Sequence, residues 1–146
     1  MQPAPKLIFV TAYATAGKSE KRSIEMKKIL VVDDSSDICD FVKNFFQERG
    51  YEVLTALNGE DAITIAKAEK PELVLLDIKM KGMDGIAALK HLREINGNQK
   101  VIMVTALDDQ DKMDEASRMG ACDYVTKPLM LDYLEHTVEK NLKERA

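Results

Sequence analysis

The sequence has little cysteine and no long apolar run, and each absence excludes a class of protein. Its two cysteines, Cys39 and Cys122, are too few for a disulfide framework, and we expect both to be small buried thiols in a reducing compartment. No apolar stretch approaches the roughly 18 residues that a membrane-spanning helix needs. The apolar run at 7–10 is also too short for a signal peptide. We therefore expect a cytoplasmic protein that does not contact a membrane.

An excess of positive charge is missing as well. The formal net charge is −4; residues 1–25 carry four basic and two acidic side chains and so contribute +2, which leaves −6 for the rest. Direct binding of nucleic acid requires clustered Lys and Arg, so we expect none. The 146 residues, 45% hydrophobic and 32% charged, are typical of one globular domain with a full core.

From Met26 onward, apolar strand patterns and amphipathic helix patterns alternate five times with short connections. This alternation predicts a parallel sheet covered by helices on both faces. Because crossover connections are right-handed, few arrangements remain, and we expect a doubly wound, flavodoxin-like α/β fold with five helices and the strand order 2-1-3-4-5. The strands are expected at 28–32, 51–56, 72–76, 100–104 and 122–125.

The helix boundaries follow from capping and breaking residues. The first helix has Ser35 and Ser36 as candidate N-caps and stops at Gly50. The second begins near Asn58, the third follows Met83-Asp84-Gly85, the fourth ends at Gly120, and the fifth runs to the end of the sequence. No output domain is therefore expected to follow it here, and both a stand-alone module and a fragment stay open. The apolar residues at helical spacing in the first helix are Ile38, Phe41, Val42, Phe45 and Phe46.

Polar side chains stand where four of the predicted strands end. Asp33 and Asp34 follow the first strand, Asp77 the third, Thr105 the fourth, and Lys127 comes just after the fifth. In open α/β sheets ligands bind outside the carboxyl ends of the strands, so we expect these side chains to converge on one pocket. Singly, each has a structural explanation, since Asp-Asp-Ser caps helices, Thr favours strands and Lys is common in turns.

The predicted pocket suits a divalent cation and a phosphoryl group. Mg²⁺ prefers oxygen ligands, which Asp33, Asp34, Asp77 and the backbone carbonyl of Lys79 can supply. The cation and Lys127 would offset the repulsion among three carboxylates. Asp77 is the best candidate nucleophile for phosphoryl transfer, with Lys127 as a point charge and the Thr105 hydroxyl as a hydrogen-bond donor to the phosphoryl group.

With these residues in place, the chain resembles the receiver domain of two-component response regulators. The resemblance covers residues 26 to about 144 and rests on six segments: Lys28 to Ser35, Leu73 to Asp77, Met83-Asp84-Gly85, Val104-Thr105-Ala106, Gly120-Ala121 and Tyr124 to Pro128. It divides the chain into an extension, 1–25, flexible or forming one extra strand, and a receiver domain, 26–146.

The resemblance implies a signalling switch and not an enzyme in the ordinary sense. Asp77 would accept a phosphoryl group from a histidine kinase or a histidine phosphotransfer protein, with Mg²⁺ as cofactor. Thr105 and Lys127 would sense the phosphoryl group, Tyr124 would be the aromatic side chain that follows the threonine, and the Lys127-Pro128 peptide bond would be cis. A downstream target, or a second copy of the chain, would bind the surface of the fourth helix, fifth strand and fifth helix.

Two other functions are weighed against this one. A constitutive docking module with the same fold would not need every acidic and Lys position, yet all are retained. A nucleotide-binding enzyme is suggested by the string 12–19, which ends in Gly17-Lys18-Ser19, but it lacks the first glycine of a phosphate loop.

The segment 6–12 matches 100–106, the predicted fourth strand and its Thr-Ala, at five of seven positions. It is therefore either a passive leader or a β-prone segment that adds to an exposed sheet edge and promotes self-association.

Overall fold

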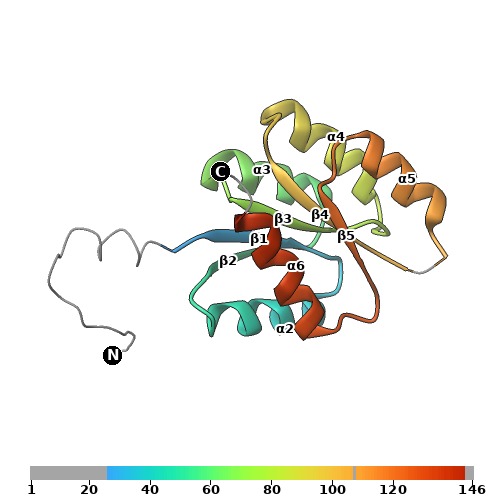
Figure 1. Cartoon of the computed structure of the whole chain (residues 1–146). Helices are drawn as coiled ribbons and strands as arrows, with labels where there is room; N and C mark the ends of the chain where they lie inside the picture. Colours follow the sequence, from blue (N-terminus) through green and yellow to red (C-terminus); the bar gives the residue numbers. More distant parts are fainter. Residues whose placement is uncertain (1–25, 107, 144–146) are drawn as a thin grey trace, which may run out of the picture.

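The computed structural model describes residues 26–106 and 108–143. The N-terminal extension with its segment 6–12, Leu107 and the last three residues lie outside the described residues, so the expectations for them are not addressed by the structure. Five helices and five strands alternate along the rest of the chain (Figure 1).

The strands form one parallel sheet in the order β2-β1-β3-β4-β5, as expected. Their bounds are β1 Lys28–Val32, β2 Glu52–Ala56, β3 Leu73–Asp77, β4 Lys100–Thr105 and β5 Asp123–Thr126. All five residues of β3 are buried, as is typical of a central strand covered on both faces. The predicted strand limits differ from these by at most one residue.

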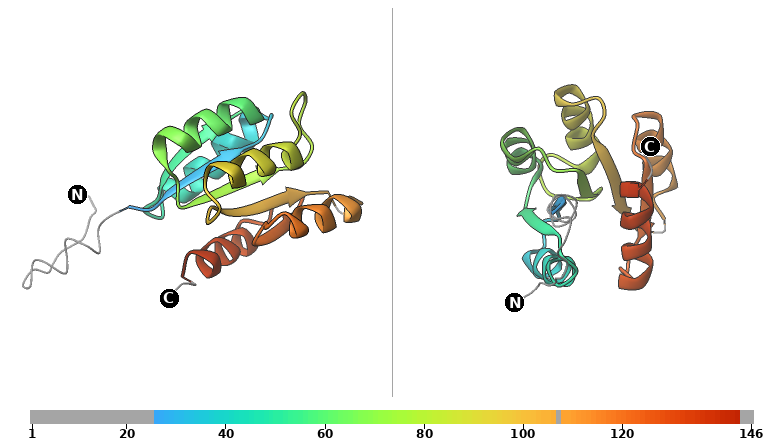
Figure 2. Two further views of the ribbon diagram at one scale, coloured as in Figure 1. Left: turned by 90° about the horizontal axis from the view of Figure 1, so that it is seen from above. Right: turned by 60° about the vertical axis from the view of Figure 1, so that its left-hand side comes forward.

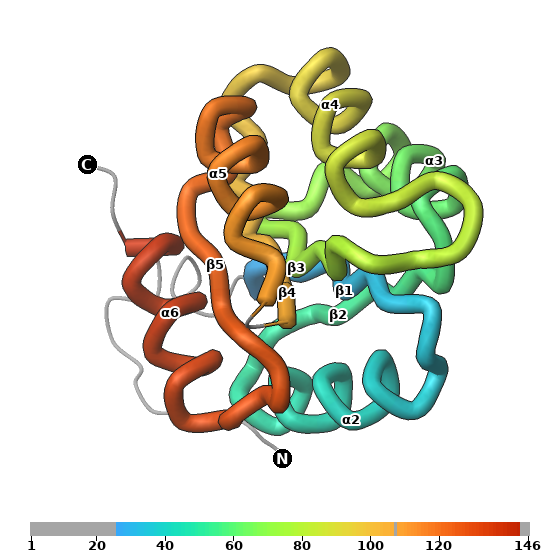
Figure 3. Tube along the Cα trace, turned by 90° about the vertical axis from the view of Figure 1, so that its right-hand side faces the viewer, coloured from blue at the N-terminus to red at the C-terminus, as the bar shows by residue number. Residues whose placement is uncertain are grey.

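Helices cover both faces of the sheet. Their bounds are α2 Ser36–Gln47, α3 Gly59–Glu69, α4 Gly85–Ile95, α5 Gln110–Arg118 and α6 Leu131–Lys143. Figure 3 shows α3, α4 and α5 along one face, and α2 and α6 along the other. Seen from above, α3, α4 and α5 lie side by side across the sheet in chain order (Figure 2). The chain reverses between the two faces at β1, which places a topological switch point beside β1 and β3.

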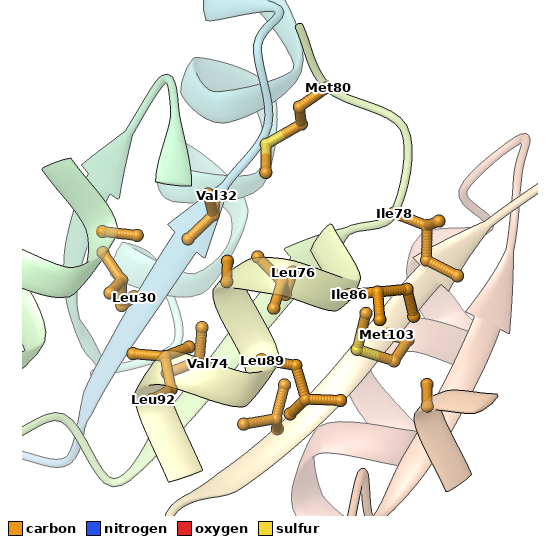
Figure 4. Packing of buried hydrophobic residues seen from close by; sticks show 14 of the residues in the cluster. Leu30, Val32, Val74, Leu76, Ile78, Met80, Ile86, Leu89, Leu92 and Met103 are labelled. Carbon is orange, nitrogen blue, oxygen red and sulfur yellow. The ribbon is translucent and has the colours of Figure 1, made fainter. Parts of the chain in front are cut away.

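Two hydrophobic clusters hold these layers together, one on each face of the sheet. In the larger cluster, Ile86, Leu89 and Leu92 of α4 lie against side chains of β1, β3 and β4 (Figure 4). The spacing of three along α4 turns all three toward the sheet, because residues three and four apart share one face of a helix. This packing fixes α4, and so fixes the loop 78–84 that joins it to β3.

One expectation about burial is wrong. Cys122 is exposed; it lies immediately before β5, an edge strand that pairs with a neighbouring strand on one side only. Phe41 is 53% exposed, because the buried face of α2 is formed by Cys39, Val42 and Phe46 and does not include it. Within 26–106 and 108–143, we find no helix both long and apolar enough to span a bilayer.

Candidate functional site

The polar residues of the predicted pocket come together at the carboxyl edge of the sheet, the edge that Figure 3 faces. Asp77 is the last residue of β3 and Thr105 the last of β4, while Asp33 follows β1 directly and Lys127 follows β5 directly. Parallel register aligns these ends, since Val32 pairs with Leu76 and Thr105 with Thr126. Because the strand ends lie next to one another, the polar residues that follow them form a single site.

Three carboxylates form the centre of this site. One carboxylate oxygen from each of Asp33, Asp34 and Asp77 lies within 4.8 Å of the others. Asp33 and Asp77 are buried and Asp34 is exposed, so the group opens to solvent on one side. Local hydrogen bonds orient two of them: Asp33 Oδ1 accepts from the Ser35 backbone N–H at 2.9 Å, and Asp34 Oδ2 accepts from the Lys81 backbone N–H at 3.3 Å.

Lys127 supplies the positive charge of the pocket. Its Nζ lies 3.2 Å from Asp33 Oδ2 and 3.3 Å from Asp77 Oδ2, so one ammonium bridges two carboxylates. The Lys127 backbone N–H donates to the Thr105 carbonyl oxygen at 2.8 Å, which extends the pairing of β5 with β4 by one residue. The Lys127-Pro128 peptide bond is cis. The two ion pairs and the backbone hydrogen bond to Thr105 hold the Lys127 ammonium over the end of β3.

Burial and neighbouring charges shift the pKa values of Asp77 and Lys127. Burial raises the pKa of Asp77 from its ordinary 3.8 to about 6; the charge of Asp33 adds to this, and Lys127 opposes it. Burial alone would lower the pKa of Lys127, but the charges of Asp77 and Asp33 outweigh it, so that pKa is raised. Asp77 is thus a carboxylate that gains from any added positive charge.

Thr105 and Tyr124 lie near the site but do not contact the carboxylates by hydrogen bonds. Thr105 is 1% exposed, and its hydroxyl donates to the Ala106 carbonyl oxygen at 3.2 Å. Tyr124 lies on β5 and is 45% exposed. The strand order places Tyr124 opposite Met103, two residues before Thr105 on the neighbouring strand.

Sequence reasoning missed a set of charged contacts around the mouth of the pocket. Lys79 Nζ lies 3.7 Å from Asp109 Oδ2, and Lys112 Nζ lies 3.8 Å from Asp84 Oδ2. Both pairs join the loop after β3 to the start of α5, and α4 and β4 lie between these two segments in the sequence. A cleft of about 460 Å³ opens beside Asp34, and its lining includes Lys79, Met80, Lys81, Asp84 and Lys112.

The glycine of Met83-Asp84-Gly85 has a structural role at the site that the motif alone does not reveal. The Gly85 backbone N–H donates to the Ile78 carbonyl oxygen at 2.8 Å, and Asp84 caps α4 by accepting from the Ala87 N–H at 2.9 Å. A Cβ at Gly85 would overlap the Asp77 carbonyl oxygen. Only glycine therefore allows α4 to begin this close to the end of β3.

A doubly wound parallel sheet with buried carboxylates, a bridging lysine and a threonine at its carboxyl edge defines a class of α/β phosphoacceptor module. The sequence model of the response regulator receiver domain matches residues 29–139, and the chain belongs to this family. It is a phospho-accepting receiver of two-component signalling.

Individual relatives agree with this assignment. Sporulation initiation phosphotransferase F of Bacillus subtilis is 40% identical over 116 residues, which cover 80% of this chain and 94% of that protein. Chemotaxis protein CheY of the same organism is 35% identical over 116 residues, 79% of this chain and 97% of that one. The receiver domain of NtrX from Brucella abortus superposes with a TM-score of 0.76 at 33% identity, covering 80% of this chain and 99% of that one. Matched transcriptional regulators are longer, and the chain spans about a quarter to a half of their length.

Proposed function

We propose that Asp77 is the residue that accepts the phosphoryl group. The observation that carries this proposal is the pairing of a buried carboxylate at the end of β3 with Lys127 Nζ at 3.3 Å, next to two further carboxylates. An oxygen of Asp77 would attack phosphorus, and the bond from phosphorus to the nitrogen of a phosphohistidine donor would break, with its electron pair returning to the imidazole. Lys127 would stabilise the charge on the transferred oxygens.

The residues fit a divalent cation of the Mg²⁺ type. Three carboxylate oxygens within 4.8 Å of one another are a typical oxygen donor set, and the Lys79 backbone carbonyl, two residues after Asp77, is a further candidate ligand. When bound, such a cation supplies positive charge to the transferred phosphoryl group. Asp33 and Asp34 would hold it, and the hydrogen bonds from Ser35 and Lys81 N–H groups would keep their carboxylates in place.

Phosphorylation would be read through Thr105, Lys127 and Tyr124. A phosphoryl group on Asp77 offers acceptors that could draw the Thr105 hydroxyl away from the Ala106 carbonyl, with which it makes a 3.2 Å hydrogen bond. Tyr124 would turn into the space vacated, and the surface of α5, β5 and α6 would change. The phosphoryl group would thus bias two states that differ in their contacts with it. The domain would also assist its own phosphorylation and dephosphorylation.

The partners follow from this function. The donor would be a histidine kinase or a histidine phosphotransfer protein, and a downstream protein or a second copy would bind the α5, β5 and α6 surface, where Tyr124, Met130 and Tyr133 are exposed. No direct binding of nucleic acid is proposed, and the protein would act in the cytoplasm. Residues 26–146 would form the receiver domain and 1–25 an extension to it.

Intact-mass measurement tests the phosphoacceptor. Wild-type protein is incubated with phosphoramidate and Mg²⁺, beside Asp77→Asn and a matched control, Asp40→Asn, which removes an exposed carboxylate from α2. We expect a single phosphoryl adduct on wild type and on the control, and none on Asp77→Asn. Equal adducts on Asp77→Asn and wild type, or no adduct on either, would favour the docking-module alternative.

A further inference from the structure

Asp109 occupies the N-cap position of α5 but does not cap the helix. The residues at the same position of α2, α3 and α4 all accept a hydrogen bond from a backbone N–H, at 3.2, 2.8 and 2.9 Å for Ser35, Asn58 and Asp84. Aspartate is among the best N-cap residues, so chemistry does not prevent Asp109 from capping. Its carboxylate is directed elsewhere.

The Asp109 carboxylate is largely shielded from solvent and makes few polar contacts in return. Its Oδ2 is buried and has no hydrogen-bond partner among the residues that the structure describes. The Lys79 ammonium lies 3.7 Å from this oxygen. The Asp109 side chain is 14% exposed, and that of Lys79 is 67% exposed. A buried carboxylate oxygen without a hydrogen bond is costly, so Asp109 attracts the exposed Lys79 ammonium more strongly than an exposed aspartate would.

Lys79 follows Asp77, the proposed phosphoacceptor, by two residues. The Ile78 backbone N–H still donates to the Val104 carbonyl oxygen, at 3.0 Å, so the chain stays extended for one residue beyond Asp77. Side chains two residues apart in an extended chain point to the same side. The Lys79 side chain can therefore turn toward the mouth of the pocket, on the side of Asp77. The pocket holds three carboxylates, of which Lys127 pairs with Asp33 and Asp77, and this excess of negative charge would attract a second ammonium.

We propose that Asp109 is a positioning residue for phosphoryl transfer to Asp77: its carboxylate keeps the Lys79 ammonium at the rim of the pocket, away from the incoming phosphoryl group. This inference rests on the proposed function of Asp77. Removing the charge of Asp109 releases the ammonium toward the pocket, where it attracts an anionic phosphodonor and stabilises the oxygens of the transferring group.

The opposing explanation is that the Lys79–Asp109 pair only fastens α5 to the loop after β3. The protein contains its own control for this, because Lys112 on α5 and Asp84 in that loop form a second ion pair, at 3.8 Å, between the same two segments. Breaking the second pair loosens α5 without releasing Lys79. A structural role would make the two pairs equivalent, whereas a positioning role sets Asp109 apart.

The test compares five proteins: wild type, Asp109→Asn, Lys79→Met, the double variant of these two, and Lys112→Met. Phosphoramidate and Mg²⁺ are supplied at low and high NaCl, and the second-order rate constant of phosphorylation is measured by intact mass. In this reaction an Asp77 oxygen forms the new bond to phosphorus, the phosphorus–nitrogen bond breaks, and the already protonated nitrogen leaves as ammonia. Asparagine keeps the shape and capping ability of aspartate, and circular dichroism checks that each variant is folded.

We expect Asp109→Asn to raise the rate constant roughly two- to fivefold at low salt, the range for one partly exposed ion pair. The rise should shrink at high salt, vanish when Lys79 is already Met, and be absent from Lys112→Met.

An unchanged or lower rate constant in Asp109→Asn, an equal rise in Lys112→Met, or a rise that survives in the double variant would overturn the positioning role. A wild-type protein that takes no phosphoryl group would remove the proposed function as well, which distinguishes the two failures.

Discussion

Replacing the proposed phosphoacceptor should stabilise the metal-free protein at neutral pH. Asp77 is 4% exposed, and its pKa is raised from 3.8 to about 6 in the folded state. Between these two values the folded protein keeps a proton that the unfolded chain has released, so stability falls as the pH rises through this window. At about 1.4 kcal/mol per unit of pKa, the ionised Asp77 costs up to about 3 kcal/mol above pH 6.

Asp77→Asn removes this cost, although Lys127 then keeps only Asp33 as a partner. We therefore expect a gain of about 1–3 kcal/mol in the free energy of unfolding at pH 7.5. The gain should fall to about 1 kcal/mol or less at pH 4.5, where the folded wild type already holds its proton. Mg²⁺ should narrow the difference at pH 7.5, because a cation that binds the folded wild type stabilises it.

Urea unfolding followed by circular dichroism, with EDTA at pH 7.5 and 4.5, measures these differences. Asp40→Asn is the matched control, since it removes an exposed carboxylate from α2 and should change stability by less than about 0.5 kcal/mol. The reasoning is refuted if Asp77→Asn is no more stable than wild type at pH 7.5, or if its gain is the same at both pH values.

The other predictions concern packing, switching and the extension. Gly85→Ala should lower the free energy of unfolding by more than about 2 kcal/mol in urea titration, because the added Cβ overlaps the Asp77 carbonyl oxygen; an unchanged midpoint would contradict this. Beryllofluoride should shift NMR signals from Asp77 through Thr105 to Tyr124, and shifts confined to the carboxylates would argue against the switch. Removing residues 1–25 should leave Asp77 phosphorylation intact but lower the sedimentation mass if the extension promotes self-association; an unchanged profile would make it a passive leader.

The fold could be predicted because each level of the sequence points to the same arrangement. The run Leu73 to Leu76 is apolar without alternation, which is typical of a strand that is covered on both faces and buries every side chain. Helix limits were readable where a capping side chain is present, as at Ser35 and Asn58. The prediction failed at Cys122, which is exposed just before β5, although the predicted strand order had already placed that strand at an edge of the sheet.

The residues of the pocket can be predicted from the sequence, whereas the ion pairs at its rim cannot. Asp77 and Lys127 stand at or just after the ends of β3 and β5, and parallel pairing brings those ends to one edge of the sheet. Lys79 and Asp109 lie in loops that have no periodicity, so the sequence does not indicate which oppositely charged residue each one contacts. Which of these pair depends on where α5 begins relative to the loop after β3, and that placement depends on tertiary packing. The residues proposed to carry out the chemistry can therefore be predicted from the strand ends. The contacts that would change its rate are found only in the folded structure.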